Sequence, residues 1–383
     1  MQTAWTLDAM DVLLYAFALT AIRDEFHLTS AAAGAMASAT LLASAAGGLL
    51  FGVVADRVGR ARSLVYTIVI YSGFTGLTAT ATGVKTLLLW RTLVGLGMGG
   101  VWSAGSVLVA ESWPAQHRGK AAGLMQSGWA FGYTLAALVT AALMPRWGWR
   151  PLFVVGLAPG LLAVWMLSGV KDAMRPRAQA GPQPIHWTPL VLRRAALASS
   201  VTSCVLFAYW GLFTWIPSYL SSPASKGGAG LSIVQSSGWI VPMQIGAFLG
   251  YTSFGFLADR FGRRPVFLAF VLVAAVITPV YGQWARNPVA LLLLGPLVGF
   301  FGHGYFSVFG AMLAELFPTA IRATAQGFCY NVGRAASALA PMTIGALSDR
   351  FGIGTALAFT AVFFAAGGAL IFLLPETKGE ELT

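Results

Sequence analysis

Apolar runs of around 20 residues recur from one end of this chain to the other, and they constrain its fold more than any other feature. A helix of about 20 apolar residues is long enough to cross the roughly 30 Å hydrocarbon core of a membrane. The composition agrees, because 57% of the 383 residues are hydrophobic and only 10% are charged. Soluble domains carry about 25% charged residues. The runs therefore predict an all-α, multi-pass integral membrane protein.

The apolar pattern predicts twelve membrane-spanning helices in two groups of six. The longest polar segment, 171–194, separates the groups, so we expect a bundle at 1–170, a linker at 171–194 and a second bundle at 195–383. The expected spans lie at approximately 3–22, 30–54, 63–82, 85–110, 120–143, 151–170, 195–220, 231–256, 265–283, 288–313, 322–346 and 354–374.

Basic residues gather in alternate loops, and this bias predicts the orientation of the chain. The positive-inside rule places the richer loops, the linker and both termini in the cytoplasm, most simply at a bacterial inner membrane. The same placement accounts for the net charge of +11 without a nucleic-acid partner. Tryptophans near the ends of spans are expected to anchor the helices at the membrane interface. These residues are Trp5, Trp113, Trp147, Trp149 and Trp187.

Two charged strings between apolar runs show that the chain is duplicated. Gly52–Arg60 reads GVVADRVGR and Gly255–Arg263 reads GFLADRFGR, roughly 200 residues later. A second pair, Glu111–Arg118 and Glu315–Arg322, keeps the same offset to within one residue and shares the pattern Glu-x-x-Pro-x-x-x-Arg. Charged loops at corresponding places in two apolar halves indicate a duplicated membrane protein whose expected role is to move a solute.

Twelve spans in two halves, with Gly-x-x-x-Asp-Arg-x-Gly-Arg after spans 2 and 8, resemble the major facilitator superfamily over essentially the whole chain. The resemblance implies two pseudo-symmetric six-helix bundles around a central cavity, which alternate access by rocking about the linker. It also implies a cytoplasmic gate made of charge pairs. Plain topology signalling by basic loops is the alternative, although it leaves the acidic partners without a role. The residues assigned to the gate are Asp56, Arg60, Glu111, Arg118, Asp259, Arg263, Glu315 and Arg322.

Shorter strings indicate the kind of solute. Asp8–Asp11 reads DAMD and resembles a signature of aromatic acid:proton symporters and sialic acid transporters, although its two middle residues depart from it. Asn331–Arg334 reads NVGR and resembles aromatic acid, niacin and organic anion carriers. We therefore expect proton-coupled symport of a small organic anion, either a monocarboxylate or an aromatic acid. The alternatives are a niacin-like or sialic-acid-like uptake carrier, an organic-ion exporter, and a transporter-shaped sensor that does not translocate.

Arg334 is the strongest candidate for binding the anion. It lies twelve residues, or about 18 Å of helix, from Arg322, and so near the middle of the bilayer, where a charge is costly. A guanidinium suits a carboxylate, which it binds through two parallel hydrogen bonds. The alternative is an arginine satisfied by carbonyls or by a carboxylate on another helix. Other candidates for the cavity at middle depth are Asn331, Tyr330, Tyr209, Trp210, Gln126 and Gln244.

Proton coupling is expected to involve the first span. Asp11 lies near mid-depth, and Asp8 lies one turn away on the same helix face. The family resemblance matches Asp11 with Arg91 of the fourth span as a pair that takes up and releases a proton. A static clamp between the two helices is the alternative. His303 is also central, and its imidazole either binds proton or substrate or is a neutral packing residue.

Other functional classes lack their sequence signatures. No Gly-x-x-x-x-Gly-Lys-Ser/Thr string occurs for binding nucleotide phosphates, and no Gly-x-Ser-x-Gly nucleophile elbow occurs. Cys204 and Cys329 fall inside spans, so no disulfide is expected, and the histidines and cysteines form no metal-like cluster. We expect no enzymatic activity, cofactor or metal. The expected partners are the organic anion, protons and membrane lipids, with the monomer as the working unit.

Overall fold

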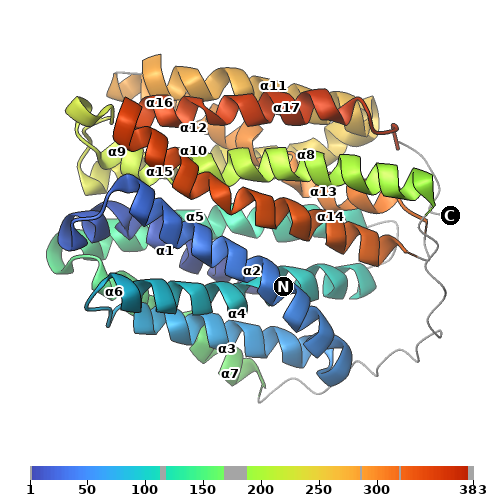
Figure 1. Cartoon of the computed structure of the whole chain (residues 1–383), viewed down its shortest axis with the longest axis horizontal. Coiled ribbons are helices and arrows are strands. Elements are labelled where there is room, and N and C mark those ends of the chain that lie inside the picture. The colour runs from blue at the N-terminus through green and yellow to red at the C-terminus, as the bar shows by residue number, and fades with distance from the viewer. Residues whose placement is uncertain (1, 113–117, 168–187, 285–286, 319–320, 378–383) are drawn as a thin grey trace.

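The computed structural model of the chain describes residues 2–112, 118–167, 188–284, 287–318 and 321–377. The regular structure of these residues is helical throughout, and no strand occurs among them. The helices run roughly side by side in two groups, with α1–α7 in the lower half of Figure 1 and α8–α17 in the upper half. This arrangement confirms the expected fold of two helical bundles.

The first bundle contains five long helices and one interrupted span. Its members are α1 (Gln2–Phe26), α2 (Ser30–Val58), α3 (Arg60–Thr78), α4 (Val84–Ser112), α5 (Arg118–Trp147), α6 (Arg150–Val155) and α7 (Ala158–Leu167). The short helices α6 and α7 together make the sixth expected span. They separate at Gly156, whose backbone lies against the side chain of Asp11 on α1.

The second bundle is built from more interrupted helices. Its members are α8 (Pro189–Phe213), α9 (Ile216–Ser221), the 3₁₀ turn η2 (Ala224–Lys226), α10 (Ile233–Phe261), α11 (Arg263–Pro279), the π-turn η3 (Val280–Trp284), α12 (Pro288–His303), α13 (Phe306–Glu315), α14 (Arg322–Ser337), α15 (Leu339–Phe351), α16 (Ile353–Ala358) and α17 (Thr360–Ile371). Consecutive helices such as α12–α13 and α14–α15 each make one expected span. Of the described helices, seven are long and apolar enough to cross a membrane by length and composition alone.

The outer surface carries large apolar side chains, as expected for helices that face lipid. Leu161, Phe256 and Val276 are each about 70% exposed (71%, 69% and 69%). A soluble protein rarely shows large contiguous apolar patches, because water opposes them. Two tryptophans depart from the interfacial role expected of them: Trp5 and Trp149 are 6% and 3% exposed. Trp5 packs against Trp129 of α5, and the Trp149 indole donates a hydrogen bond to Glu25.

The duplication seen in the sequence is also present in the backbone. The helix α10 begins and ends 203 residues after α2 begins and ends, and α11 begins 203 residues after α3 begins. Between the helices of each pair lies the glycine of the Gly-Arg dipeptide, Gly59 with φ of 95° and Gly262 with φ of 103°. A Cβ atom makes this region unfavourable, so the motif requires glycine where the chain reverses between spans.

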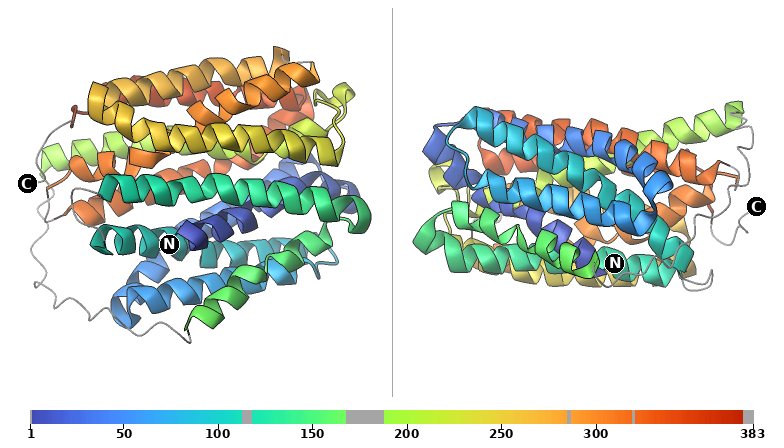
Figure 2. Two further views of the ribbon diagram at one scale, coloured as in Figure 1. Left: turned by 180° about the vertical axis from the view of Figure 1, so that it is seen from behind. Right: turned by 90° about the horizontal axis from the view of Figure 1, so that it is seen from below.

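The two bundles meet along two pairs of helices. The helix α2 packs along α15, and α5 packs along α10 (Figures 1 and 2). The contact between α2 and α15 is close because Gly34 lies against the Pro341 carbonyl, where an added Cβ would be 2.3 Å from the oxygen. Loops gather at two ends of the molecule. The end with the α2–α3 and α10–α11 turns is called the linker end, and the end with the α1–α2 and α15–α16 turns is called the far end.

The helix that follows the expected linker begins earlier than the composition indicated. The helix α8 begins at Pro189, where Thr188 accepts a hydrogen bond from the Val191 N–H at 3.3 Å, so residues 189–194 are helical. A proline at the first helical position costs the helix no hydrogen bond, because an N–H there would have no partner within the helix. The threonine cap adds a hydrogen bond to the first turn, so both residues favour this start. Residues 168–187 lie outside the described part of the chain. The domain boundaries at 170 and 195 therefore stay predictions.

Candidate functional site

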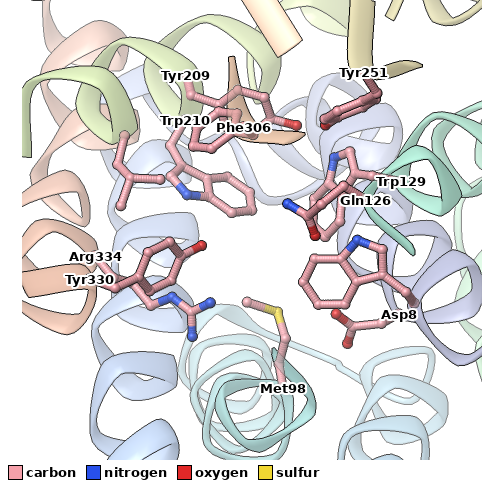
Figure 3. A pocket seen from close by; sticks show the side chains of 12 residues that line it. Asp8, Met98, Gln126, Trp129, Tyr209, Trp210, Tyr251, Phe306, Tyr330 and Arg334 are labelled. Atoms are coloured by element: carbon pink, nitrogen blue, oxygen red, sulfur yellow. The ribbon is translucent and has the colours of Figure 1, made fainter. Parts of the chain in front are cut away.

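A cavity lies between the two bundles near the middle of the molecule (Figure 3). The space enclosed by its lining, with the open space at its mouth, is about 510 Å³. Both bundles contribute to it, as expected for a site that moves between two faces of a membrane. The lining residues are Trp5, Asp8, Met98, Gln126, Trp129, Leu206, Tyr209, Trp210, Tyr251, Phe306, Tyr330 and Arg334.

Arg334 of α14 supplies the positive charge of this cavity. The side chain is 6% exposed, and its guanidinium carbon lies 5.1 Å from the centroid of the Tyr330 ring. No carboxylate oxygen lies within ion-pair distance of Arg334 in the part of the chain that the structure describes. Figure 3 shows its guanidinium pointing toward the centre of the cavity. A buried guanidinium without a carboxylate partner is available to an anionic ligand.

Asp8 of α1 lies on the opposite wall. It is 2% exposed, and one carboxylate oxygen, Oδ1, has no hydrogen-bond partner. In Figure 3 the carboxylate of Asp8 and the guanidinium of Arg334 face each other across the cavity. They form no direct ion pair, so the two charged groups are separated by the space that a ligand would fill.

Several other polar atoms of the cavity are buried without a partner. Buried polar groups in folded proteins are almost always hydrogen-bonded, so a cluster of unsatisfied groups on one cavity indicates that a ligand or water completes them. The Trp129 indole and the Tyr209 hydroxyl approach each other, but neither meets hydrogen-bond geometry. The unsatisfied atoms are Trp5 Nε1, Asp8 Oδ1, Gln126 Oε1, Trp129 Nε1 and Tyr209 OH.

Three tryptophans shape the cavity. The ring centroids of Trp5 and Trp129 are 5.2 Å apart, and those of Trp129 and Trp210 are 6.0 Å apart at nearly right angles. Such contacts hold large rings in fixed positions. The result is a cavity with rigid aromatic walls, one cation and a set of hydrogen-bonding groups on the facing wall.

The structure brings six of the sequence-predicted residues together around the cavity: Arg334, Tyr330, Tyr209, Trp210, Gln126 and Asp8. Trp5 and Trp129 were missed as cavity residues, although a signal existed. Trp5 lies three residues before Asp8 and Trp129 three residues after Gln126, so each pair shares a helix face.

Three of the residues predicted to bind substrate lie outside the cavity lining. Asn331 donates to the Gly327 carbonyl at 2.9 Å and lies against Gly48 of α2. Gln244 is fully buried in α10, where both of its side-chain polar atoms lack partners. His303 lies behind the aromatic lining, with its ring 4.0 Å from Phe213 and its Nδ1 3.2 Å from the Gly299 carbonyl. The role of each in substrate binding stays a prediction.

Asp11 and Arg91 do not form a direct ion pair in this structure. Asp11 accepts a hydrogen bond from the Thr75 hydroxyl at 2.6 Å and faces α3 and α6. The guanidinium carbon of Arg91 lies 4.7 Å from the centroid of the Tyr15 ring. The two residues therefore point to different parts of the first bundle, and their expected exchange of partners stays a prediction.

The predicted gate residues of the second half gather at the linker end. Arg263 contacts the carboxylates of Asp259 and Glu315. The C-terminal segment joins this cluster, because Glu376 accepts hydrogen bonds from the backbone N–H groups of Arg263 and Arg264 at 2.8 and 3.0 Å. Arg322 lies at the start of α14 and donates to the Phe317 carbonyl. The side chains of Asp56, Arg60, Glu111 and Arg118 lie outside the described residues.

At the far end, hydrogen bonds join the two bundles to each other. Asp349 of α15 accepts from the N–H groups of Ser30 and Ala31, the first residues of α2. Two further cross-bundle bonds lie in the same half of the molecule: Thr20 to Ser218 at 3.1 Å and Met342 to Ser38 at 3.2 Å. The far end is thus closed in this structure.

Two duplicated bundles of apolar helices, with a polar cavity between them at mid-depth, define a multi-pass membrane transporter rather than an enzyme. The sequence profile of the Major Facilitator Superfamily matches residues 4–251 and 224–383. The chain therefore belongs to the Major Facilitator Superfamily.

Similar proteins match over nearly the full chain. A putative metabolite transport protein of Haemophilus influenzae is 37% identical, covering 98% of this chain and 95% of its own. A probable 4-methylmuconolactone transporter of Cupriavidus pinatubonensis is 36% identical over 98% of this chain and 89% of its own. The cis,cis-muconate transport protein of Acinetobacter baylyi is 33% identical over 95% and 90%. Among solved structures, the D-xylose-proton symporter has a TM-score of 0.80 at 20% identity, covering 100% of this chain and 98% of its own, and this shows a shared fold.

Proposed function

We propose that this transporter carries a small organic anion by alternating access and couples its movement to a proton. The observation that carries the proposal is Arg334, a buried cation without a carboxylate partner that faces the central cavity. The names of two relatives, which refer to 4-methylmuconolactone and cis,cis-muconate, support a substrate of this kind.

The substrate carboxylate binds Arg334 through two parallel hydrogen bonds, which fix its orientation as well as its charge. The tryptophan walls favour a flat or compact carbon skeleton, which they contact through large rigid surfaces. The unsatisfied groups on the first-bundle wall then bind a second polar group, at the end of the substrate opposite its carboxylate. A ligand held at both ends contacts both bundles at once, and this is how it biases the bundles toward closing around it.

The proton is carried by a carboxylate of α1. The sequence favours Asp11 with Arg91, whereas the cavity geometry favours Asp8, which faces Arg334. An ionised Asp8 and the substrate carboxylate compete for one guanidinium and repel each other in a site of low dielectric. Protonation of Asp8 removes this competition, so anion and proton bind more tightly together than either does alone.

Orientation follows from the loop charges. With the linker end in the cytoplasm, the Asp349 contacts close the side that faces outward, and the Asp259–Arg263–Glu315 cluster lies at the inner rim. Labelling of a single cysteine introduced at position 180 tests this orientation, since an impermeant thiol reagent added outside intact cells is expected to leave it unmodified.

Counterflow of labelled carboxylates in proteoliposomes tests the proposed function. The wild type is expected to exchange a compact aromatic carboxylate, Arg334→Lys to bind it at least tenfold more weakly, and Arg334→Ala to lose saturable uptake. Saturable uptake of carboxylates by Arg334→Ala at the wild-type rate would overturn the assignment. A protein that binds the acid but exchanges none would be a sensor.

A further inference from the structure

A second cavity lies next to the central one, and a buried arginine lines it. The space enclosed by its lining, with the open space at its mouth, is about 350 Å³, and Met98 and Trp210 line both cavities. Arg91 of α4 is the one charged residue among the described residues that line it. Half of the remaining lining is aliphatic and comes from α1 and α2. The second cavity therefore has a single guanidinium in a largely apolar wall, together with the hydroxyl groups of Tyr15, Thr40 and Thr214.

Arg91 has hydrogen-bonding capacity that no neighbour uses. It is 2% exposed, and both its Nε and its Nη1 lack a hydrogen-bond partner. The hydroxyls of Tyr15 and Thr40, which also line this cavity, already donate to the carbonyls of Ala33 and Met36. Thr214 also lines the cavity, but Arg91 supplies the only charged donors among the described lining residues. A buried guanidinium without an ion-pair partner is strongly unfavourable unless an anion or water meets it.

Asp11 does not meet this need in the present conformation. It is close enough to Arg91 to interact electrostatically, but none of its oxygens lies within ion-pair distance of the guanidinium among the described contacts. Its Oδ2 accepts from Thr75, and its Oδ1 lies against Gly156. The carboxylate therefore faces α3 and α6, away from the second cavity.

The second cavity lies closer to the far end than the central cavity does. Arg91 is seven residues from the start of α4 at the far end, or about 10 Å of helix. Arg334 is seventeen residues from the end of α15 at the same end, or about 25 Å of helix. The second cavity thus lies between the closed far end and the central cavity.

We propose that Arg91 forms an outer anion site, at which a carboxylate binds before it passes Met98 and Trp210 and reaches Arg334. This inference rests on the proposed function, because it assumes that the far end faces outward and that the solute is an anion. Two guanidiniums at successive depths give the anion a charged partner at each stage of an otherwise apolar path. Met98 suits the boundary between the cavities, because its unbranched side chain changes rotamer readily.

Binding of benzoate to the purified protein, followed by calorimetry, tests the outer site. The wild type is expected to bind benzoate tightly at Arg334. Arg334→Ala is expected to keep a saturable site at least tenfold weaker, and Arg334→Ala/Arg91→Gln to keep none. Arg334→Ala/Asp11→Asn is expected to retain the weak site, because Asp11 does not bind the ligand. Arg334→Ala/Arg150→Gln is the matched control, since Arg150 is an arginine of the same end that pairs with Glu25 outside both cavities.

The outcomes separate this inference from the proposed function. If the wild type binds benzoate through Arg334 but Arg334→Ala retains no saturable binding, the outer site is wrong and the proposed function stands. Residual binding that survives Arg91→Gln also overturns the outer site. If the wild type binds no benzoate or other aromatic carboxylate, both proposals fail. Should Arg91→Gln not fold, Arg91→Lys keeps the charge and is expected to weaken the residual site without abolishing it.

Discussion

The carboxylate of Asp349 caps helix α2 of the opposite bundle at Ser30. Its Oδ1 accepts from the Ser30 N–H at 3.0 Å, and its Oδ2 accepts from the Ala31 N–H at 2.9 Å. Thr29 caps the next N–H of the same helix, that of Ala32, so side chains from both bundles satisfy the first turn. Asp349 begins a third Asp-Arg-x-Gly string, which is identical to that at 259–262 but lies at the other end of the molecule.

We expect Asp349→Ala to weaken closure of the far end. Losing a helix cap costs about 1 kcal/mol, which corresponds to about a fivefold shift toward the state open at that end. The measurement is the rate at which an impermeant thiol reagent modifies a cysteine placed at position 126 from outside, with Cys204 and Cys329 replaced. Asp24→Asn, which removes an exposed carboxylate at the same end, serves as the control. Equal rates in Asp349→Ala and the wild type would show that the cap does not hold the far end closed.

Asp8→Asn is expected to uncouple transport from the proton gradient. The amide cannot gain or lose a proton, so uphill uptake driven by a pH gradient should fall at least tenfold while exchange at equal pH persists. Asp11→Asn is the matched comparison, because its amide oxygen still accepts from Thr75. Uncoupling by Asp11→Asn alone would return the proton site to Asp11, and accumulation by both variants would place it on another group such as His303.

Trp129→Phe is expected to reduce the preference for a substrate with a second acceptor. The change keeps an aromatic ring but removes the unsatisfied indole N–H. One hydrogen bond contributes about 1 kcal/mol, so the wild type should prefer 4-acetylbenzoate to benzoate about fivefold, and the variant should not. Trp210→Phe is the control, since its N–H is not among the unsatisfied groups. An unchanged ratio of dissociation constants in Trp129→Phe would rule out contact with the second acceptor.

Asp259→Asn and Glu376→Gln are expected to slow transport more than they weaken binding. Both carboxylates contact Arg263 at the linker end, through its side chain and its backbone N–H respectively, and neither lines the cavity. Each loss should lower the turnover rate several-fold and leave the dissociation constant within about twofold, because an exposed charge pair and a helix cap each contribute about 1 kcal/mol. Asp259→Glu, which keeps the charge, should retain most of the rate. Turnover and binding are measured on the same preparation, and wild-type turnover in both variants would remove them from the gate.

The sequence was sufficient to predict the spans and the depth of their polar residues. A run of about 20 apolar residues fits only one role in a bilayer, and the rise of a helix converts residue number into depth. Arg334 and Asp11 were therefore placed near the middle, with Asp8 one turn away, and the repeated strings at 52–60 and 255–263 located the turns of the two halves. Residue order along the chain and membrane thickness together determine where the spans lie and how deep each polar residue is.

Only the tertiary structure decided which way each helix face points. A helix that is apolar all round has little amphipathic pattern, so its sequence does not say whether a residue meets lipid, a neighbouring helix or the cavity. Asn331 thus faces α2 instead of the cavity, and Trp5 lines the cavity instead of the membrane interface. The cap of Asp349 on α2 joins residues 319 positions apart. Such contacts depend on how two bundles pack against each other, and no local pattern records that packing.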